Sequence, residues 1–315
     1  MGRLDLTQVG VVLDPWRDEK AMKEFLAWRK DSCGKARATI IRDWGVLDAW
    51  VKWINHPSRR EWDITADVFE RFAGRPRNGR RNMGGTGSPS TRKADIACMR
   101  SVGKFFQARG WTADNPAALA VAPTVPGKTP HPLSDDEWLR LWHGTTDASG
   151  TWLLAAGGLF TFRRAEITAV RIETWRDGMI SPMVRKGGSQ HSFPYAEVLD
   201  IVSSRMPALL PDPQRVIAAV EELRAGRSEG PLVPRWDRFR DNVINRDLAA
   251  LCEAVELDPI NPHRLRDTAI TNILRCGVPL HLVQELAAHS DPAMTARYAR
   301  RGGSELAEWR RREGF

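Results

Sequence analysis

Tyr298 and the basic residues that precede it have the composition of a site that attacks a phosphodiester. Tyr298 is one of only two tyrosines among 315 residues, and it follows the runs Asn261-Pro262-His263-Arg264-Leu265-Arg266 and His289-Ser290-Asp291. A phenol can act as the nucleophile, guanidinium groups can stabilise charge on the non-bridging oxygens, and imidazoles can carry protons. Together these residue types predict DNA strand cleavage through a covalent phosphotyrosine.

The charge of the chain is unevenly distributed along its length. A chain of 315 residues predicts two domains, and its formal charge is +8 with a pI of about 9.7. Residues 1–120 contain 22 Lys and Arg against 14 Asp and Glu, whereas residues 121–315 contain 25 of each kind. The whole positive surplus therefore belongs to the first part of the chain, which predicts a DNA-binding module there.

Cysteine usage and hydropathy argue against several classes of protein. The four cysteines are far apart and form no Cys-x-x-Cys pair, so neither a zinc site nor a disulfide framework is expected, and we expect no metal or other cofactor. No apolar run approaches the ~18 residues that a membrane span requires, and residues 1–15 lack a signal-peptide core. These patterns predict a cytoplasmic protein without membrane partners, associated with the nucleoid when it binds DNA.

Residues 16–120 are predicted to form a helical domain that binds DNA, after a short N-terminal extension at residues 1–15. Apolar residues recur there at helical spacing, first in Met22, Phe25 and Leu26 and then in Trp44, Leu47 and Trp50. Residues 71–93 contain seven Lys or Arg, no acid, and several Gly, Asn and Ser. This stretch is either a solvated flexible loop or a loop that contacts phosphates and orders on DNA. The second alternative makes DNA-binding residues of Arg75, Arg77, Arg80 and Arg81.

A helix predicted over residues 90–109 has one basic and one apolar face. At about 100° per residue, Lys93, Arg100 and Lys104 fall within roughly 40° of one another. Met99 and Phe106 lie on the opposite side, which is suited to packing. A merely solvated face usually mixes both signs of charge, so this face is predicted to contact the DNA backbone.

Four prolines between residues 121 and 133 predict a linker between the two domains. The second domain is expected over residues 134–300, and its first helix begins with Ser134 as the N-cap. Strands are predicted over residues 179–185 and 190–195, joined by a bend at Gly187-Gly188. A helix is expected over residues 237–255, and Asp291-Pro292 is typical of the start of another. Residues 301–315 form a tail that is a candidate for docking on a neighbouring protomer.

Over roughly residues 16–300 the chain resembles the tyrosine recombinase family, also called phage integrases. The spacing of His263, Arg266, His289 and Tyr298 resembles the family's second motif box. The run Phe160-Thr161-Phe162-Arg163-Arg164-Ala165-Glu166 stands where the family usually has Thr-Gly-Leu-Arg-x-x-Glu. The segment around Lys186 resembles the family's lysine-bearing β-turn. The fold that this resemblance implies is mainly α-helical: a SAM-like core-DNA-binding domain, followed by a helical catalytic domain with a small antiparallel sheet, the two forming a clamp around DNA.

The resemblance also assigns roles to individual residues. It implies that Arg163 and Arg266 bind the scissile phosphate, with Arg164 as the alternative if the first box is displaced by one residue. It implies that Lys186 protonates the departing 5′ oxygen, that His263 is the acid or base partner, and that His289 donates to the phosphate. Glu166 is expected to support the arginines through a buried ion pair. Tyr195, next to Pro194 in a predicted strand, is interpreted as a structural residue.

Several residues depart from the family pattern. Asp267 stands where the family often has a second histidine, Ala287-Ala288 replaces Leu-Gly before His289, and Phe162 replaces the leucine before the first arginine. None of these departures removes a catalytic group.

The sequence therefore predicts a site-specific DNA recombinase that forms a 3′-phosphotyrosyl link through Tyr298. Its expected partners are double-stranded DNA with core sites, three further copies of itself in a synaptic tetramer, and accessory DNA-bending proteins. Two alternatives stay open at this stage. A type IB topoisomerase uses the same chemistry without synapsis, and a basic DNA-binding protein uses none of it.

Overall fold

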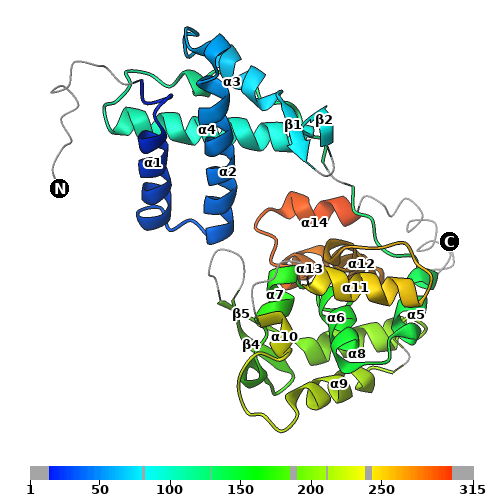
Figure 1. Ribbon diagram of the computed structural model, residues 1–315. Helices are drawn as coiled ribbons and strands as arrows, with labels where there is room; N and C mark the ends of the chain where they lie inside the picture. The colour runs from blue at the N-terminus through cyan, green and yellow to red at the C-terminus, as the bar shows by residue number, and fades with distance from the viewer. Residues whose placement is uncertain are drawn as a thin grey trace. The chain divides into compact units, whose positions relative to one another are not determined.

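The computed structural model describes residues 14–79, 82–127, 129–184, 190–210, 212–237 and 243–299, and the chain divides into two compact units, Met1–Gly127 and Lys128–Phe315 (Figure 1). Each unit has its own apolar core. The described part is mainly helical with two small antiparallel sheets, as expected from the sequence.

In its described residues, the N-terminal unit has four α-helices, two 3-10 helices and one hairpin. Its elements are α1 (Glu19–Asp31), α2 (Arg37–Ile54), the 3-10 helix η2 (Pro57–Arg59), α3 (Ala66–Ala73), β1 (Pro76–Gly79), β2 (Asn82–Thr86), α4 (Pro89–Ala108) and η3 (Pro116–Ala118). Aromatic rings fill its core: the Trp50 ring stacks on Phe69 with centroids 4.9 Å apart, and Trp16 meets Phe69 at the same distance. Strands β1 and β2 lie within residues 71–93, so this predicted loop is partly a β-hairpin.

The C-terminal unit is built around one buried helix. Its helices are α5 (Asp135–Gly144), α6 (Ala148–Gly158), α7 (Arg164–Ala169), η4 (Ile172–Thr174), α8 (Tyr195–Arg205), α9 (Gln214–Arg224), α10 (Pro234–Asp237), α11 (Val243–Ala254), α12 (Pro262–Arg275), α13 (Leu280–Leu286) and α14 (Pro292–Ala299). α6 is buried along almost its whole length and contacts α5, α9, α11 and α12 (Figure 1). This core fixes α12, which contributes most of the second motif box.

A three-stranded antiparallel sheet, in the order β3-β4-β5, lies after α7. β3 (Trp175–Arg176) pairs with β4 (Met179–Val184), which pairs with β5 (Gln190–Phe193). The prediction for Tyr195 is corrected here, because β5 ends at Phe193 and Tyr195 begins α8. Its ring is buried and stacks on Trp175 with centroids 3.8 Å apart, so it packs the core from a helix.

Local sequence signals set the boundaries of the helices that carry the site. The Ser134 side chain accepts from the backbone of Glu137 while Glu137 accepts from the backbone of Ser134, a capping box that starts α5. Asn261 accepts from the backbone nitrogens of His263 (2.9 Å) and Arg264 (3.1 Å), so α12 begins with a capped first turn. The helix predicted over residues 237–255 is present as α11, with residues 238–242 outside the described part of the chain.

Candidate active site

The first predicted arginine lies at the start of α7 and is fixed by a buried carboxylate. Glu166 is 3% exposed and accepts from both the Arg163 backbone nitrogen (2.8 Å) and the Arg163 Nη1 (2.9 Å). The Arg163 Nη2 donates to the carbonyl oxygen of Ala288 at 3.1 Å. Ala288 is 125 residues away in sequence and immediately precedes His289, so Arg163 is attached to the turn before His289.

The second predicted arginine is almost completely enclosed. Arg266, on α12, is 1% exposed and donates from Nη1 to the Thr161 carbonyl and from Nη2 to the Ala287 carbonyl. Its Nη1 also lies 4.0 Å from the second oxygen of Glu166. One carboxylate therefore lies between the two guanidinium groups, and the two motif boxes meet around it.

Two residues that offer carbonyls to these arginines have left-handed backbone conformations. Thr161 has φ 61° and Ala288 has φ 45°. Both stand where the family pattern has glycine, the residue that adopts positive φ at least cost. The Thr161 hydroxyl also donates to the Leu286 carbonyl at 3.0 Å, which helps to hold that turn. The backbone shape is retained here although glycine is absent.

His289 is buried beside the arginines and against the ring of Tyr298. Its Nδ1 lies 2.8 Å from the Thr295 hydroxyl, and its ring stacks on Tyr298 with centroids 6.3 Å apart. Burial, together with the positive charges of Arg266 and Arg163, lowers the pKa of His289 from 6.5 to about 4. The imidazole is therefore neutral at neutral pH and can donate one hydrogen bond from its protonated nitrogen.

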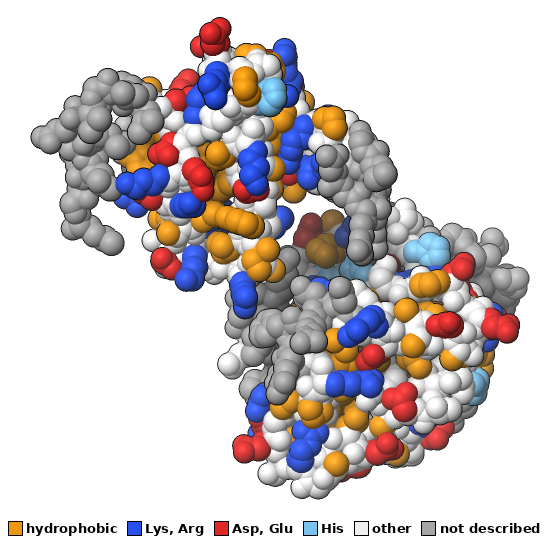
Figure 2. All heavy atoms as spheres, in the orientation of Figure 1, with side chains coloured by type: hydrophobic (Ala, Val, Ile, Leu, Met, Phe, Trp, Pro, Cys, Tyr) orange, Lys and Arg blue, Asp and Glu red, His pale blue; other side chains and the backbone are white. Residues whose placement is uncertain are grey.

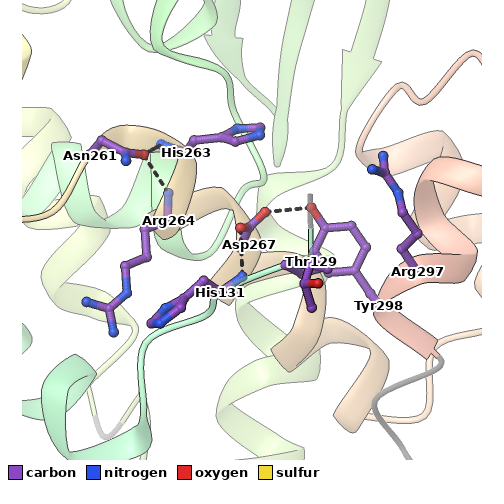
Figure 3. Close-up of a pocket in the computed structure, with 9 residues that line it drawn as sticks. Thr129, His131, Asn261, His263, Arg264, Asp267, Arg297 and Tyr298 are labelled. Carbon is purple, nitrogen blue, oxygen red and sulfur yellow. Dashed lines mark hydrogen bonds between the residues drawn. The ribbon is translucent and has the colours of Figure 1, made fainter. Parts of the chain in front are cut away.

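The predicted nucleophile is held by a carboxylate that the sequence did not single out for this role. Tyr298 is 9% exposed, and its hydroxyl donates to Asp267 Oδ1 at 2.6 Å (Figure 3). The other oxygen of Asp267 accepts from the His131 backbone nitrogen at 3.1 Å. Burial and the adjacent carboxylate both raise the pKa of Tyr298 above its usual value of 10, so the phenol is protonated at rest.

These groups border a cavity of about 390 Å³ in the C-terminal unit (Figure 3). Its walls are formed by Thr129, Pro130, His131, Asn261, His263, Arg264, Asp267, Arg297 and Tyr298. Arg297, one residue before the tyrosine, lines this cavity and adds a positive charge beside the phenol. His263 lines it too and is exposed, whereas the phenolic proton points to Asp267.

Of the two remaining predicted positions, Lys186 and Arg164, only Arg164 lies within the described residues. Lys186 lies between β4 and β5 and outside the described residues. Arg164, the alternative to Arg163, is an exposed residue of the first turn of α7. Arg163 binds Glu166 within the first motif box and the Ala288 carbonyl next to His289 of the second.

The predicted DNA-binding residues fall into three groups. Arg75 and Arg77 both pair with Asp95, which is 2% exposed, and Arg100 donates to the carbonyls of Ala117 and Ala120, so these arginines have structural contacts within the unit. Lys93 and Lys104 are exposed on α4. Arg80 and Arg81 lie outside the described residues.

The opposite face of α4 packs as predicted, since Met99 and Phe106 are fully buried. On the visible face of the N-terminal unit, acidic and basic side chains are interspersed (Figure 2). Basic charge is therefore dispersed on that side of the unit.

The described residues contain neither a metal-binding cluster nor a membrane-spanning helix. Among them, no group of three or more His, Cys, Asp or Glu side chains could hold a metal ion. None of the helices found there is long and apolar enough to cross a membrane.

Sequence comparison places these features in a family. The profile of the phage integrase family matches residues 218–303. The tyrosine recombinase XerC of Xanthomonas campestris pv. campestris is 30% identical over 235 residues, covering 70% of this chain and 67% of that protein. The chain belongs to the tyrosine recombinase family. XerD of Caulobacter vibrioides, also a tyrosine recombinase, is 28% identical over 235 residues and 73% covered. The predicted family is therefore confirmed.

Solved structures share the fold. A lambda integrase(75-356) dimer bound to a COC′ core site matches with a TM-score of 0.63 at 16% identity, covering 87% of this chain and 95% of that one. XerH recombinase in a post-cleavage complex matches with a TM-score of 0.64 at 13% identity, covering 92% and 82%. At such identities the similarity shows the fold alone, and it confirms the predicted mainly helical class.

Sequence reasoning missed three contributors to the site. Asp267 was interpreted as a departure from the family pattern, Arg297 had no assigned role, and the backbone of His131 was placed in a linker. A carboxylate directly after the second arginine was the one available signal, but its partner Tyr298 is 31 residues away.

Proposed function

We propose that this tyrosine recombinase cleaves and rejoins DNA strands at specific sites, with Tyr298 as the nucleophile. The phenolic oxygen attacks the scissile phosphorus, a 3′-phosphotyrosyl bond forms, and the 5′ oxygen leaves with a proton. The 5′ hydroxyl of a partner strand then attacks the phosphotyrosine and releases Tyr298. The intermediate conserves the energy of the broken bond, so the exchange requires no ATP.

The observation that carries this proposal is the convergence of three groups from separate segments. Glu166 lies between Arg163 and Arg266, and His289, adjacent to the carbonyl that holds Arg163, stacks on Tyr298. Two fixed guanidinium groups near a phenol suit a pentavalent phosphorus, whose non-bridging oxygens gain charge in the transition state. Removing one such donor is expected to slow cleavage about a hundredfold or more.

The histidines and the lysine have distinct proposed tasks. The proposed tautomer of the neutral His289 has Nδ1 accepting from the Thr295 hydroxyl and the proton on Nε2, from which it donates to the phosphate. His263, exposed on the cavity wall, is the sequence-based candidate for exchanging protons with the reacting groups. Lys186 protonates the departing 5′ oxygen.

The proposed partners are duplex DNA and further copies of the chain. Support comes from the solved neighbours, which include a lambda integrase tetramer bound to a Holliday junction, at a TM-score of 0.64 and 15% identity. Lys93 and Lys104 are proposed to contact the DNA backbone from α4. We further propose that the two units form a clamp around the duplex, and that accessory proteins bend the DNA.

Covalent capture tests the proposed chemistry and finds the target site together. A library of nicked duplexes with randomised cores is incubated with the full chain, and complexes that survive denaturation are recovered and sequenced. We expect an enriched core sequence and an adduct that Tyr298→Phe abolishes without loss of DNA binding. Tyr195→Phe is the matched control, because Tyr195 packs against Trp175 and should leave the adduct intact.

The same duplexes and variants distinguish the proposed recombinase from a non-catalytic DNA-binding protein and from a type IB topoisomerase. An adduct equally abundant in Tyr298→Phe contradicts the assignment of Tyr298 as the nucleophile. No adduct from the wild-type chain on any core contradicts the proposed cleavage and favours a non-catalytic DNA-binding protein. If the selected duplexes are cleaved but never exchange strands, while supercoiled plasmid is relaxed, the activity is that of a topoisomerase.

A further inference from the structure

Asp267 joins the nucleophile to the segment that enters the catalytic unit. Its Oδ1 lies 2.6 Å from the Tyr298 hydroxyl, and its Oδ2 lies 3.1 Å from the His131 nitrogen. The neighbouring Thr268 hydroxyl accepts from the Leu133 backbone nitrogen at 2.8 Å, so residues 131–133 are fixed to α12 at two successive positions. The carboxylate is 8% exposed, and its orientation is set by two partners on opposite oxygens.

The phenol must lose its proton as its oxygen bonds to phosphorus. An acceptor has to be within about 2.6–3.2 Å of that oxygen, and Asp267 satisfies this condition before any substrate arrives. His263, the sequence-based candidate for this task, is an exposed residue of the cavity wall, and the phenolic hydrogen bond is made to Asp267. We propose that Asp267 is a catalytic residue of this recombinase, the general base that accepts the Tyr298 proton during cleavage and returns it during rejoining.

Proton transfer from Tyr298 to Asp267 needs no group beyond those already named, and this assignment rests on the proposed function. The Tyr298 oxygen forms a bond to phosphorus, its proton moves to Asp267 Oδ1, and the bond from phosphorus to the 5′ oxygen breaks with protonation of that oxygen by a separate acid. Rejoining reverses each movement. The transfer leaves Asp267 neutral when the phosphate gains charge, so the carboxylate does not repel the transition state.

The charges around Tyr298 and Asp267 favour proton transfer from the phenol to the carboxylate. Arg266 on α12 and Arg297 on α14 both stabilise negative charge on the phenolic oxygen, and Asp267 opposes it until it takes the proton. His289 stacks on the Tyr298 ring and is neutral at neutral pH. His263 and Arg264 on α12 and the side chain of His131 also line the cavity. The segment that contains His131 contributes its backbone nitrogen.

Single-turnover cleavage by the full chain tests the proposal on the duplex selected by covalent capture. Asp267→Asn retains the shape of the side chain but cannot take the proton. We expect cleavage at pH 7 to slow about 10²–10³-fold, with the rate then rising towards tenfold per pH unit as hydroxide removes the phenolic proton. The folding of the variant is checked by its thermal transition and by DNA binding.

A duplex with sulfur in place of the 5′ bridging oxygen distinguishes the two proton transfers. A thiolate leaves without an acid, so the sulfur duplex should restore cleavage by Lys186→Ala but not by Asp267→Asn. Equal or faster cleavage by Asp267→Asn, or its rescue by sulfur, would overturn the assignment and leave Asp267 as a residue that restrains Tyr298 or acts on the leaving group.

A measurement on the wild-type chain applies if Asp267→Asn does not fold. With the sulfur duplex the phenolic proton is the only one transferred, so cleavage should be slower in heavy water. The absence of an isotope effect overturns the proposal. If the wild-type chain forms no adduct on any duplex, both the proposed function and the assignment of Asp267 are wrong. If Asp267→Asn forms the adduct at the wild-type rate, only the assignment of Asp267 is wrong.

Discussion

Replacing Ala288 by glycine should stabilise the catalytic unit, although most substitutions to glycine destabilise a protein. Ala288 has φ 45°, in the left-handed region that costs an L-residue roughly 1–2 kcal/mol. Its carbonyl accepts from Arg163, so this conformation directs the main chain towards the site. Glycine adopts the same conformation without the steric cost and keeps the carbonyl.

The expected gain follows from two opposing terms. Relief of the left-handed strain contributes about 1–2 kcal/mol, and the greater flexibility of glycine in the unfolded chain takes back about 0.5–1 kcal/mol. Ala288 is only partly buried, so the loss of its methyl group costs little. The difference between these two terms spans about 0–1.5 kcal/mol, so the free energy of unfolding should rise by a central value of ~0.75 kcal/mol.

The neighbouring alanine provides a matched control with the opposite sign. Ala287 has φ −78°, is fully buried, and offers its carbonyl to Arg266. Ala287→Gly gains no strain relief and should lose about 1–2 kcal/mol through backbone entropy and lost burial.

Hydrogen exchange of peptides covering α13 and α14 reports both variants without requiring two-state unfolding of the whole chain. Slower exchange in Ala288→Gly and faster exchange in Ala287→Gly are expected. If both variants exchange faster, the left-handed turn is not the strained element that we infer.

Three other predictions test the charges of the site and of the N-terminal unit. Because the pKa of His289 is lowered from 6.5 to about 4, the unfolded chain binds this proton at a higher pH than the folded chain does. The free energy of unfolding should therefore fall by up to ~3 kcal/mol as the pH drops from 6.5 to 4. Urea titrations of His289→Gln should not show this fall. Arg266→Lys should lower the thermal transition more than Arg163→Lys, because Arg266 is 1% exposed and the Arg163 side chain 27%; equal shifts would contradict the burial argument. Replacing Lys93 and Lys104 by Gln should weaken DNA binding and reduce its salt dependence by about one unit of slope per lost phosphate contact, which titrations at several salt concentrations would measure.

Short-range patterns in the sequence predicted much of the fold correctly. Helix α4 and the strands β4 and β5 follow from periodicity and turn residues, because those signals act within a few positions of the chain. The spacing prediction failed at Trp44, which was grouped with Leu47 and Trp50 but is 56% exposed. Trp50 is fully buried, and a residue six positions earlier lies about 120° away around the helix, beyond the packed face.

The uses of individual charges were harder to predict than the elements that carry them. Arg100 has the spacing of a DNA-binding face, but its guanidinium is bound by the carbonyls of Ala117 and Ala120. Arg75 and Arg77 belong to a basic stretch whose compensating acid, Asp95, comes later in the chain. Composition counts such charges correctly, but it does not show which of them already have partners inside the fold.

The architecture of the site explains why the departures from the family pattern leave it assembled. Arg266 is held by the main-chain carbonyls of Thr161 and Ala287, and Arg163 by the Ala288 carbonyl together with the Glu166 carboxylate. A carbonyl is present whatever the side chain, so these turns require a backbone direction more than a residue type. Thr161 and Ala288 supply that direction at positive φ, at a cost in strain that glycine would avoid. Asp267 is different, because its contact with Tyr298 is made by the side chain itself, and a substitution there changes the group that accepts the phenolic hydrogen bond.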